Sequence, residues 1–144
     1  MPNEILPGIW IGNGKDIYNN NFLINKNINC IISTVNKDKD IELIYLPIED
    51  KYELFIEYIY DIVTFIHKKN IEYKNILIYC KTGKQISPAI ICCYLIKYGK
   101  LSQEKAINTV KTKSNIAFVE SCKLKDQLNK FMKNILIKVY GKCV

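Results

Sequence analysis

The apolar residues of the chain fall into two kinds of segment, short runs of strand length and longer stretches with helical spacing. The short runs predict strands at residues 4–11, where Pro7 and Gly8 interrupt the strand, and at 30–35, 41–48 and 75–79. The helical spacing predicts helices at residues 17–25, 54–67, 88–98, 103–111 and 124–135. This order predicts one α/β domain spanning residues 1–144, built on a central mixed sheet of four or five strands with helices on both faces.

The stretch NILIYCKTGKQISPAIICCYLIKYG, residues 75–99, carries the most informative pattern in the chain. Its first apolar run ends at Cys80, a loop containing a glycine follows, and Ser87 with Pro88 is typical of a helix N-cap and first helical residue. The amide groups of such a loop and the positive end of the helix dipole bind an anion such as phosphate. The same electrostatics favour deprotonation of a cysteine at the end of the strand.

This loop resembles that of the cysteine-dependent protein tyrosine phosphatase superfamily, and within it the dual-specificity type, including poxvirus-like members. The family's loop reads His-Cys, five residues, Arg and Ser, with a glycine third after the cysteine. Cys80, Gly83 and Ser87 match this pattern, whereas Tyr79 replaces the histidine and Ile86 replaces the arginine. The resemblance extends over nearly the whole chain, although only the loop and its flanks are specific.

The resemblance implies a role for each matching residue. Cys80 would attack phosphorus, Asp50 would protonate the leaving oxygen as the general acid, and Ser87 would stabilise the thiolate when it leaves. On the residues alone, a helix cap is an equally good interpretation of Asp50. The implied phosphate-binding residues are those of the loop itself, Lys81, Thr82, Gly83, Lys84, Gln85, Ile86 and Ser87.

The replacement of the arginine by Ile86 dominates the functional expectation. An arginine that acts on a phosphoryl transition state contributes a factor of ~10³ to 10⁵ in rate, and isoleucine offers neither a charge nor a hydrogen-bond donor. All 21 basic residues of the chain are lysines, so no other guanidinium can substitute. Lys81 and Lys84 can attract phosphate as point charges but cannot copy the bidentate geometry, and they fit solvent-exposed loop charges as well.

Three functions are consistent with these residues. We favour a pseudophosphatase, a catalytically impaired phosphatase-like protein that binds a phosphoprotein, another protein partner or a phosphorylated ligand. Because Cys80, Asp50 and Ser87 are retained, the first alternative is a weakly active cysteine-dependent phosphatase acting on phosphotyrosine, phosphoserine or RNA 5′-phosphates. The second alternative is a purely structural interaction subunit whose loop has no chemical role. The sequence leaves the oligomeric state open.

Charge and cysteine content narrow the possible partners. The formal net charge of +7 is carried by scattered lysines, which indicates a solvated surface and makes nucleic acid an unfavoured partner. Six cysteines and one histidine show no metal-ligand spacing, so we expect no metal and no cofactor. Most of the cysteines are expected to be small buried apolar residues.

Segment patterns and composition indicate the expected compartment and the type of source organism. No segment has the pattern of a signal peptide or a membrane span, so we expect an intracellular, cytoplasmic protein with no membrane partner. The 26 isoleucines, 21 lysines and 15 asparagines suggest an AT-rich gene, as in some viruses and protozoa. A viral protein of this kind would lie in the host cell or in the virion.

Overall fold

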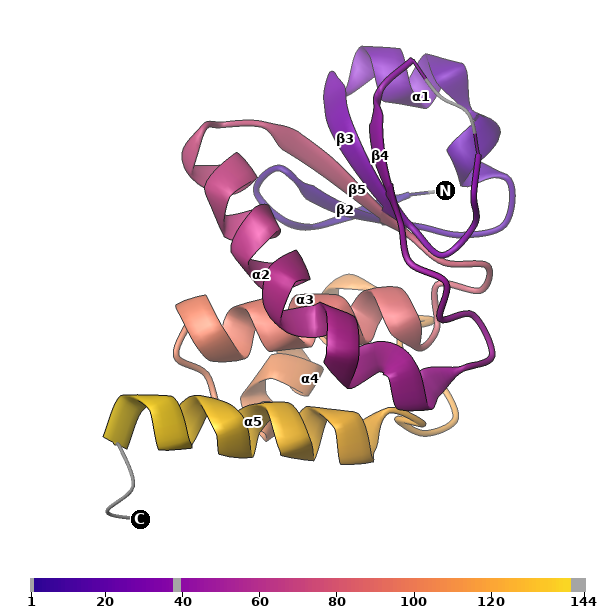
Figure 1. Cartoon of the computed structure of the whole chain (residues 1–144). Helices are drawn as coiled ribbons and strands as arrows, with labels where there is room; N and C mark the ends of the chain where they lie inside the picture. Colours follow the sequence, from indigo (N-terminus) through magenta and orange to yellow (C-terminus); the bar gives the residue numbers. More distant parts are fainter. Residues whose placement is uncertain (1, 38–39, 141–144) are drawn as a thin grey trace.

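Five strands form one mixed sheet in the order β1-β2-β5-β3-β4 in the computed structural model, which describes residues 2–37 and 40–140 (Figure 1). The strands are β1 (Asn3–Leu6), β2 (Ile9–Gly12), β3 (Ile28–Ser33), β4 (Glu42–Tyr45) and β5 (Asn75–Tyr79). β1 pairs antiparallel with β2, whereas the pairs β2–β5, β5–β3 and β3–β4 are parallel. The carboxyl ends of four parallel strands therefore lie at one edge of the sheet, and the expected mixed α/β architecture is confirmed.

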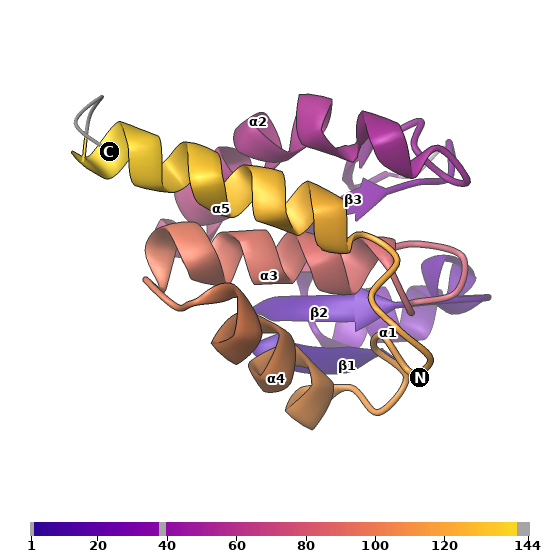
Figure 2. The ribbon, with the colours of Figure 1, turned by 90° about the horizontal axis from the view of Figure 1, so that it is seen from below.

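Helices cover both faces of this sheet. The larger layer consists of α2 (Phe55–Ile71), α3 (Ile86–Tyr98), α4 (Gln103–Lys113) and α5 (Lys125–Tyr140). Within it α3 packs against α2, α4 and α5, and it lies between α5 and the strands (Figures 1 and 2). The opposite face carries the 3-10 helix η1 (Asp16–Tyr18) and α1 (Asn20–Asn25). Among the described residues, no helix combines the length and the apolar character needed to cross a membrane.

The alternation of side chains along β5 divides the interior into two cores. Ile76, Ile78 and Cys80 belong to the larger core under α2 to α5, whereas Leu77 and Tyr79 belong to the smaller core on the side of α1. All five side chains are buried. A strand that is covered on both faces has no polar face, which explains why residues 75–79 form a nearly continuous apolar run.

α3 is buried on all sides. Every residue from 86 to 96 is buried, so the helix lacks the polar stripe of a surface helix. It begins earlier than predicted, with Ile86 as its first residue and Gln85 at the N-cap position, where the side chain makes no capping hydrogen bond. The prediction that Ser87 caps this helix is wrong, because the Ser87 hydroxyl is turned toward Cys80.

The remaining helices occupy the predicted positions with shifted ends. α2 and α5 continue by about one turn beyond their expected ends. The helix expected at 17–25 is divided into η1 and α1, because the side chain of Asn19 accepts a hydrogen bond from Phe22 N (3.1 Å) and caps a new helix there. Ser102 caps α4 as predicted and accepts a hydrogen bond from Lys105 N at 3.2 Å.

The predicted strands also shift at their ends, except β5. The segment 4–11 forms β1 and β2, separated at Gly8, which has a φ of +80°. The strand expected at 30–35 is β3, which starts earlier and stops at Ser33. The strand expected at 41–48 is β4, which ends at Tyr45; Leu46 N still donates to Ser33 O (2.7 Å) before the chain leaves the sheet.

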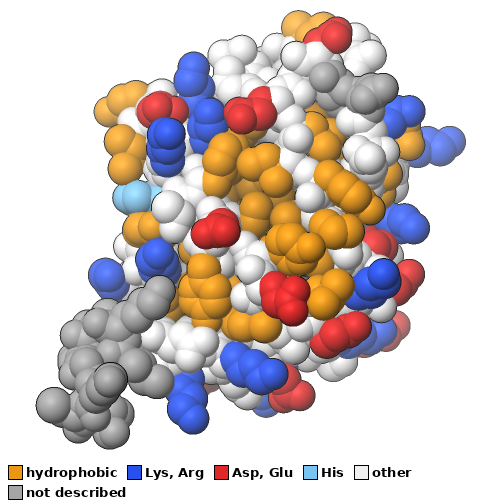
Figure 3. Space-filling model, in the orientation of Figure 1, with side chains coloured by type: hydrophobic (Ala, Val, Ile, Leu, Met, Phe, Trp, Pro, Cys, Tyr) orange, Lys and Arg blue, Asp and Glu red, His pale blue; other side chains and the backbone are white. Residues whose placement is uncertain are grey.

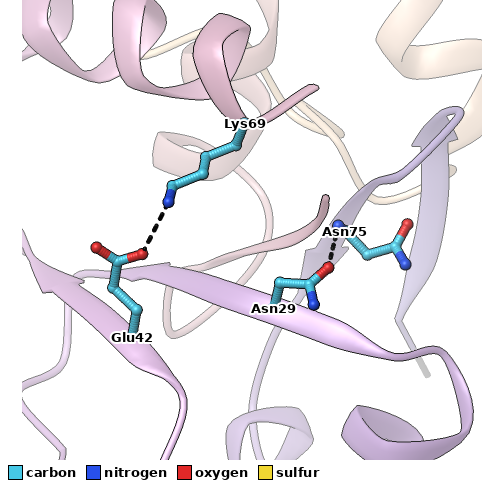
Figure 4. Close-up of polar contacts among 4 residues, drawn as sticks. All are labelled: Asn29, Glu42, Lys69 and Asn75. Carbon is cyan, nitrogen blue, oxygen red and sulfur yellow. Dashed lines mark hydrogen bonds and ion pairs between the residues drawn. The ribbon is translucent and has the colours of Figure 1, made fainter. Parts of the chain in front are cut away.

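Two polar contacts fix the β3 side of the sheet (Figure 4). The register between β3 and β5 shifts at Asn29, and the side-chain oxygen of Asn29 accepts a hydrogen bond from Asn75 N (2.7 Å). This bond gives the first amide of β5 a partner at the point where the strand ladder is irregular. Lys69 of α2 forms an ion pair with Glu42 of β4 (3.2 Å), which joins the helix to the outer strand.

Replacing Asn29 should destabilise the sheet at this irregularity. Asn29→Ala should lower the free energy of unfolding by about 1 kcal/mol, because it leaves the partly buried Asn75 amide without its acceptor. Asn29→Asp keeps an oxygen at the same place and should remain closer to the natural chain. Urea unfolding of the three proteins measures the difference. Equal stability of the alanine variant and the natural chain would contradict this role of Asn29.

Candidate active site

The loop between β5 and α3 folds around the sulfur of Cys80. Gly83 N donates a hydrogen bond to Cys80 Sγ at 3.2 Å, and Ser87 Oγ lies 3.2 Å from the same sulfur. Cys80 is 1% exposed, so its sulfur lies at the bottom of the loop rather than on the surface. The fold thus brings together the three residues that carry the sequence pattern, with the sulfur in contact with both an amide and a hydroxyl.

The turn after β2 holds the first half of the loop. Gly14 N donates to Lys81 O (2.9 Å), and Asn13 Nδ2 donates to Thr82 O (3.2 Å). The next loop residue, Gly83, has a φ of +69°, and a Cβ at this position would lie 3.0 Å from the Cβ of Asn13. Both the left-handed backbone and the close approach of the turn therefore require glycine.

The segment before α5 holds the second half of the loop. Phe118 N donates to Lys84 O (2.8 Å). The buried side chain of Gln85 donates through Nε2 to Ser121 O and accepts through Oε1 from Lys123 N, each at 2.9 Å. A hollow of about 210 Å³ remains beside the loop, lined by Tyr52, Thr82, Lys84, Gln85, Val119, Glu120 and Lys123.

These contacts give the loop the arrangement of a candidate anion cradle. The carbonyl oxygens of residues 81, 82 and 84 are engaged by the supporting segments, which suits phosphate binding because carbonyl oxygens would repel an anion. Lys81 and Lys84 are exposed at its rim. Ile86, at the position where the resemblance expects an arginine, is 1% exposed and belongs to the larger core. Ile86 therefore adds hydrocarbon to the core and no side-chain donor to the cradle.

The carboxyl group in contact with the loop is that of Glu49. Glu49 Oε2 accepts a hydrogen bond from Thr34 Oγ1 (2.5 Å) and lies 3.5 Å from Lys81 N. Asp50, the expected general acid, is exposed and has a φ of +60°. Asp50 does not cap the following 3-10 helix η2 (Tyr52–Leu54), whose N-cap position belongs to the next residue and has no side-chain hydrogen bond.

Sequence reasoning missed the position of Glu49, although one signal pointed to it. Glu49 directly follows the segment predicted as a strand, and Cys80 directly follows another. In a parallel sheet such residues meet at the same edge. The family pattern drew attention to Asp50 instead, because the pattern has an aspartate at that position.

Two tyrosines border the loop on different sides. Tyr79, at the position of the family's histidine, donates its hydroxyl to Gly14 O, on the side of the smaller core. Burial raises the pKa of Tyr79, and its contact shows that it supports the turn after β2. Tyr52 is half-buried, and burial raises its pKa, with further contributions from the charges of Glu49 and Cys80.

The other cysteines of the described chain are held as thiols by burial. Cys30, Cys92 and Cys93 are buried, and burial raises the pKa of Cys30 to about 11 and that of Cys93 well above its ordinary value. Cys122 is half-buried, and Cys143 lies outside the described residues. In the part of the chain that the structure describes, no three His, Cys, Asp or Glu side chains lie together in a way that could hold a metal ion.

Comparison with known proteins agrees with this geometry. The family model described as "Dual specificity phosphatase, catalytic domain" matches residues 9–134. The chain is 26% identical over 114 residues to dual specificity protein phosphatase 22-B of Danio rerio, covering 76% of this chain and 62% of that protein. It is 25% identical over 119 residues to putative tyrosine phosphatase 123R of Invertebrate iridescent virus 6, covering 81% and 82%.

The solved structures include a close match in fold. A leucine rich repeat and phosphatase domain containing protein from Entamoeba histolytica superposes with a TM-score of 0.82 at 25% sequence identity. The superposition covers 98% of this chain and 95% of that one. The chain therefore spans nearly all of this solved chain, but less than two thirds of the fish relative.

One glycine in the loop and one in the turn that supports it offer a matched test of how the loop is packed. Gly83→Ala and Gly14→Ala both place a side chain in the left-handed region, at a cost of roughly 1–2 kcal/mol each. At Gly14 an added Cβ meets nothing within 4 Å, whereas at Gly83 it lies 3.0 Å from Asn13 Cβ and 3.3 Å from Ile116 Cδ1. Gly83→Ala should therefore destabilise the protein by about 1 kcal/mol more than Gly14→Ala. Chemical denaturation of both variants decides the point, and equal losses would show that the loop is not packed against the turn.

Proposed function

The chain belongs to the dual specificity phosphatase family, and we propose that it is a catalytically impaired member, a pseudophosphatase whose loop binds a phosphorylated protein without efficient turnover. The observation that carries this proposal is the side chain of Ile86, which packs in the core at the position of the family's arginine. The same position in an active loop must offer charged donors to the phosphoryl oxygens. Here it offers a hydrocarbon side chain.

The chemistry that Ile86 removes can be stated step by step. In the family reaction a cysteine thiolate attacks phosphorus, the bond to the leaving oxygen breaks, and that oxygen takes a proton. Charge spreads over the three other phosphoryl oxygens in the transition state, where an arginine contributes ~10³ to 10⁵ in rate. All basic residues of this chain are lysines, and the exposed Lys81 and Lys84 act at most as point charges.

The parts of the loop that bind an anion are retained. The amide groups of the loop and the first turn of α3 do not depend on the side chain of Ile86. Two segments of the chain hold the loop in its folded shape, the turn after β2 through Asn13 and Gly14 and the segment before α5 through Phe118, Ser121 and Lys123. Recognition of a phosphate group is therefore easier to retain than its hydrolysis.

A weakly active phosphatase is the first alternative function, and one observation favours it. Ser87 Oγ lies 3.2 Å from Cys80 Sγ, the position from which a hydroxyl stabilises a thiolate leaving group. A loop used for binding alone does not require this contact. Such an enzyme would act on a phosphotyrosine, a phosphoserine or an RNA 5′-phosphate, at a rate limited by the missing arginine.

An interaction subunit is the second alternative, and the surface of the molecule bears on it. Figure 3 shows apolar side chains gathered over α2 and beside it, with acidic side chains among them. Ile56 and Tyr60, one turn apart on α2, are partly exposed while packing against the larger core. Such a surface suits a protein partner, and it is compatible with the pseudophosphatase proposal.

Turnover of a small aryl phosphate tests the proposal directly. The natural chain and Cys80→Ser should be equally inactive, whereas Ile86→Arg should gain activity by a factor on the order of 10³ or more. Ile86→Lys brings a similar aliphatic chain and one positive charge but no bidentate guanidinium group, so its gain in activity should be much smaller. Thermal melting of each variant shows whether the core accepts the longer side chain.

Two controls make the outcome decisive. Cys122→Ser removes a half-buried thiol that lies outside the loop and should leave every rate unchanged. Activity of the Ile86→Arg protein should disappear when Cys80→Ser is added. Activity of the natural chain that Cys80→Ser abolishes would overturn the proposal and favour the weak phosphatase.

Anion binding supplies a second prediction. Calorimetry at low salt should show binding of inorganic phosphate with a dissociation constant in the millimolar range, and added sodium chloride should weaken it. Gly83→Ala should reduce the affinity, because a Cβ at this position displaces the loop against Asn13. Complete absence of phosphate binding by the natural chain would argue that the loop is a structural remnant.

A further inference from the structure

We infer that Glu49 is an internal anionic ligand of the cradle, so that a phosphate group must displace its carboxylate in order to bind. This inference rests on the proposed anion-binding function of the loop and deepens it. Glu49 lies outside the loop motif, and its role is inferred from its contacts. This competition lowers the affinity of the loop for phosphate groups.

The fold fixes the place of Glu49. Three segments leave the carboxyl edge of the sheet side by side: the one after β3, the one after β4 and the loop after β5. Thr34 N donates to Tyr79 O of β5 (3.2 Å) and Leu46 N donates to Ser33 O of β3 (2.7 Å), so each segment is bound to the end of the adjacent strand at this edge. Glu49 follows three residues after Leu46 and reaches the start of the loop from there.

One oxygen atom of Glu49 makes both contacts. Oε2 accepts the hydrogen bond of Thr34 Oγ1 at 2.5 Å, and the same atom lies 3.5 Å from Lys81 N, the first amide after Cys80. Thr34 is buried, so its hydroxyl holds the carboxylate in a fixed direction. After burial, the charge of Glu49 is the next cause that raises the pKa of the half-buried Tyr52, and Cys80 contributes as well.

This position puts the carboxylate in competition with an incoming anion. A phosphate oxygen bonded to Lys81 N would lie about 2.9 Å from that nitrogen. Glu49 Oε2 lies 3.5 Å from the same nitrogen. The two oxygens would then be only a few ångströms apart. Even in bulk water, one pair of like charges about 4 Å apart weakens binding roughly fivefold, and a dianion carries two charges. Removal of the charge should therefore raise phosphate affinity about tenfold or more.

The same contact places a negative charge next to an amide of the loop. An anion cradle places several amide dipoles in the same direction, which is unfavourable when no negative charge faces them. The Glu49 carboxylate supplies that charge from within the chain. The folded loop is then a complete structure by itself, with a resident anion at its first amide.

Glu49→Gln tests the inference, with Glu53→Gln as the matched control. Both substitutions remove one carboxylate from the segment after β4, and Glu53 is exposed in η2. The probe is inorganic phosphate, measured by calorimetry at low salt and by the rise in melting temperature that it causes. Glu49→Gln should bind phosphate at least about tenfold more tightly than the natural chain, and Glu53→Gln should differ from the natural chain by less than about twofold.

Thr34→Val separates the charge of Glu49 from its position. This variant keeps the carboxylate but removes the hydroxyl that holds it, so phosphate affinity should rise by less than in Glu49→Gln. An equal rise in Glu49→Gln and Glu53→Gln would reduce the effect to net charge and overturn the inference. No rise in Glu49→Gln, or a fall in affinity in Thr34→Val, would overturn it as well.

Phosphate binding of Glu49→Gln is also measured in the Ile86→Arg protein, or in Ile86→Lys if the arginine variant unfolds. This second background separates the inference on Glu49 from the proposed function. There the added cation strengthens phosphate binding, and Glu49→Gln must still raise the affinity. Failure of Glu49→Gln to do so in both backgrounds overturns the internal-ligand inference alone. Cys80-dependent turnover by the natural chain overturns the proposed pseudophosphatase alone.

Discussion

The position of β5 between two parallel neighbours is the constraint on which the site depends. β2 and β3 pair with the two edges of β5, so Cys80 emerges at the carboxyl edge in the middle of the sheet. Parallel sheets place their ligands at this edge. Gly14 after β2 and Thr34 after β3 lie at the same edge. Gly14 N donates to Lys81 O, and Thr34 N donates to Tyr79 O. The groups that support the loop therefore arrive through the order of the strands, although they are far apart in the sequence.

Ile86 contributes to the core at the position where the family pattern has an arginine. Its side chain is part of the larger core, and burying an isoleucine contributes about 1.5–3 kcal/mol to stability. An arginine at this position would have to keep its charged end out of that core. The shape of the loop does not depend on such a side chain, because the turn after β2 and the segment before α5 hold the loop from outside. An isoleucine at this position thus adds to the core and leaves the hydrogen bonds that support the loop in place.

The sequence predicted the parts of the structure that depend on local pattern. β5 was predicted residue for residue, because a strand covered on both faces is continuously apolar and stops where the polar loop begins. Ser87 has the composition of an N-cap, yet the sulfur of Cys80 takes its hydroxyl, a tertiary contact that local preference does not reveal. Glu49 was missed for the same reason, since its partner Thr34 lies on another strand end. The roles expected for Cys80 and Asp50 in catalysis stay predictions.

On the proposed function, one residue of the loop and one residue beside it both lower the affinity of the loop for phosphate. Ile86 removes a cation from the cradle, and Glu49 brings an anion to its first amide. Since a charge-assisted hydrogen bond contributes roughly 1.5–3 kcal/mol, a phosphate group alone becomes a poor ligand. The donors that remain are backbone amides, which bind any anion of suitable size. On the proposed function, a specific partner must therefore add contacts outside the loop, and the hollow bordered by Lys84 and Lys123 adjoins the loop. The proposal thus assigns specificity to the surface around the loop more than to the loop itself.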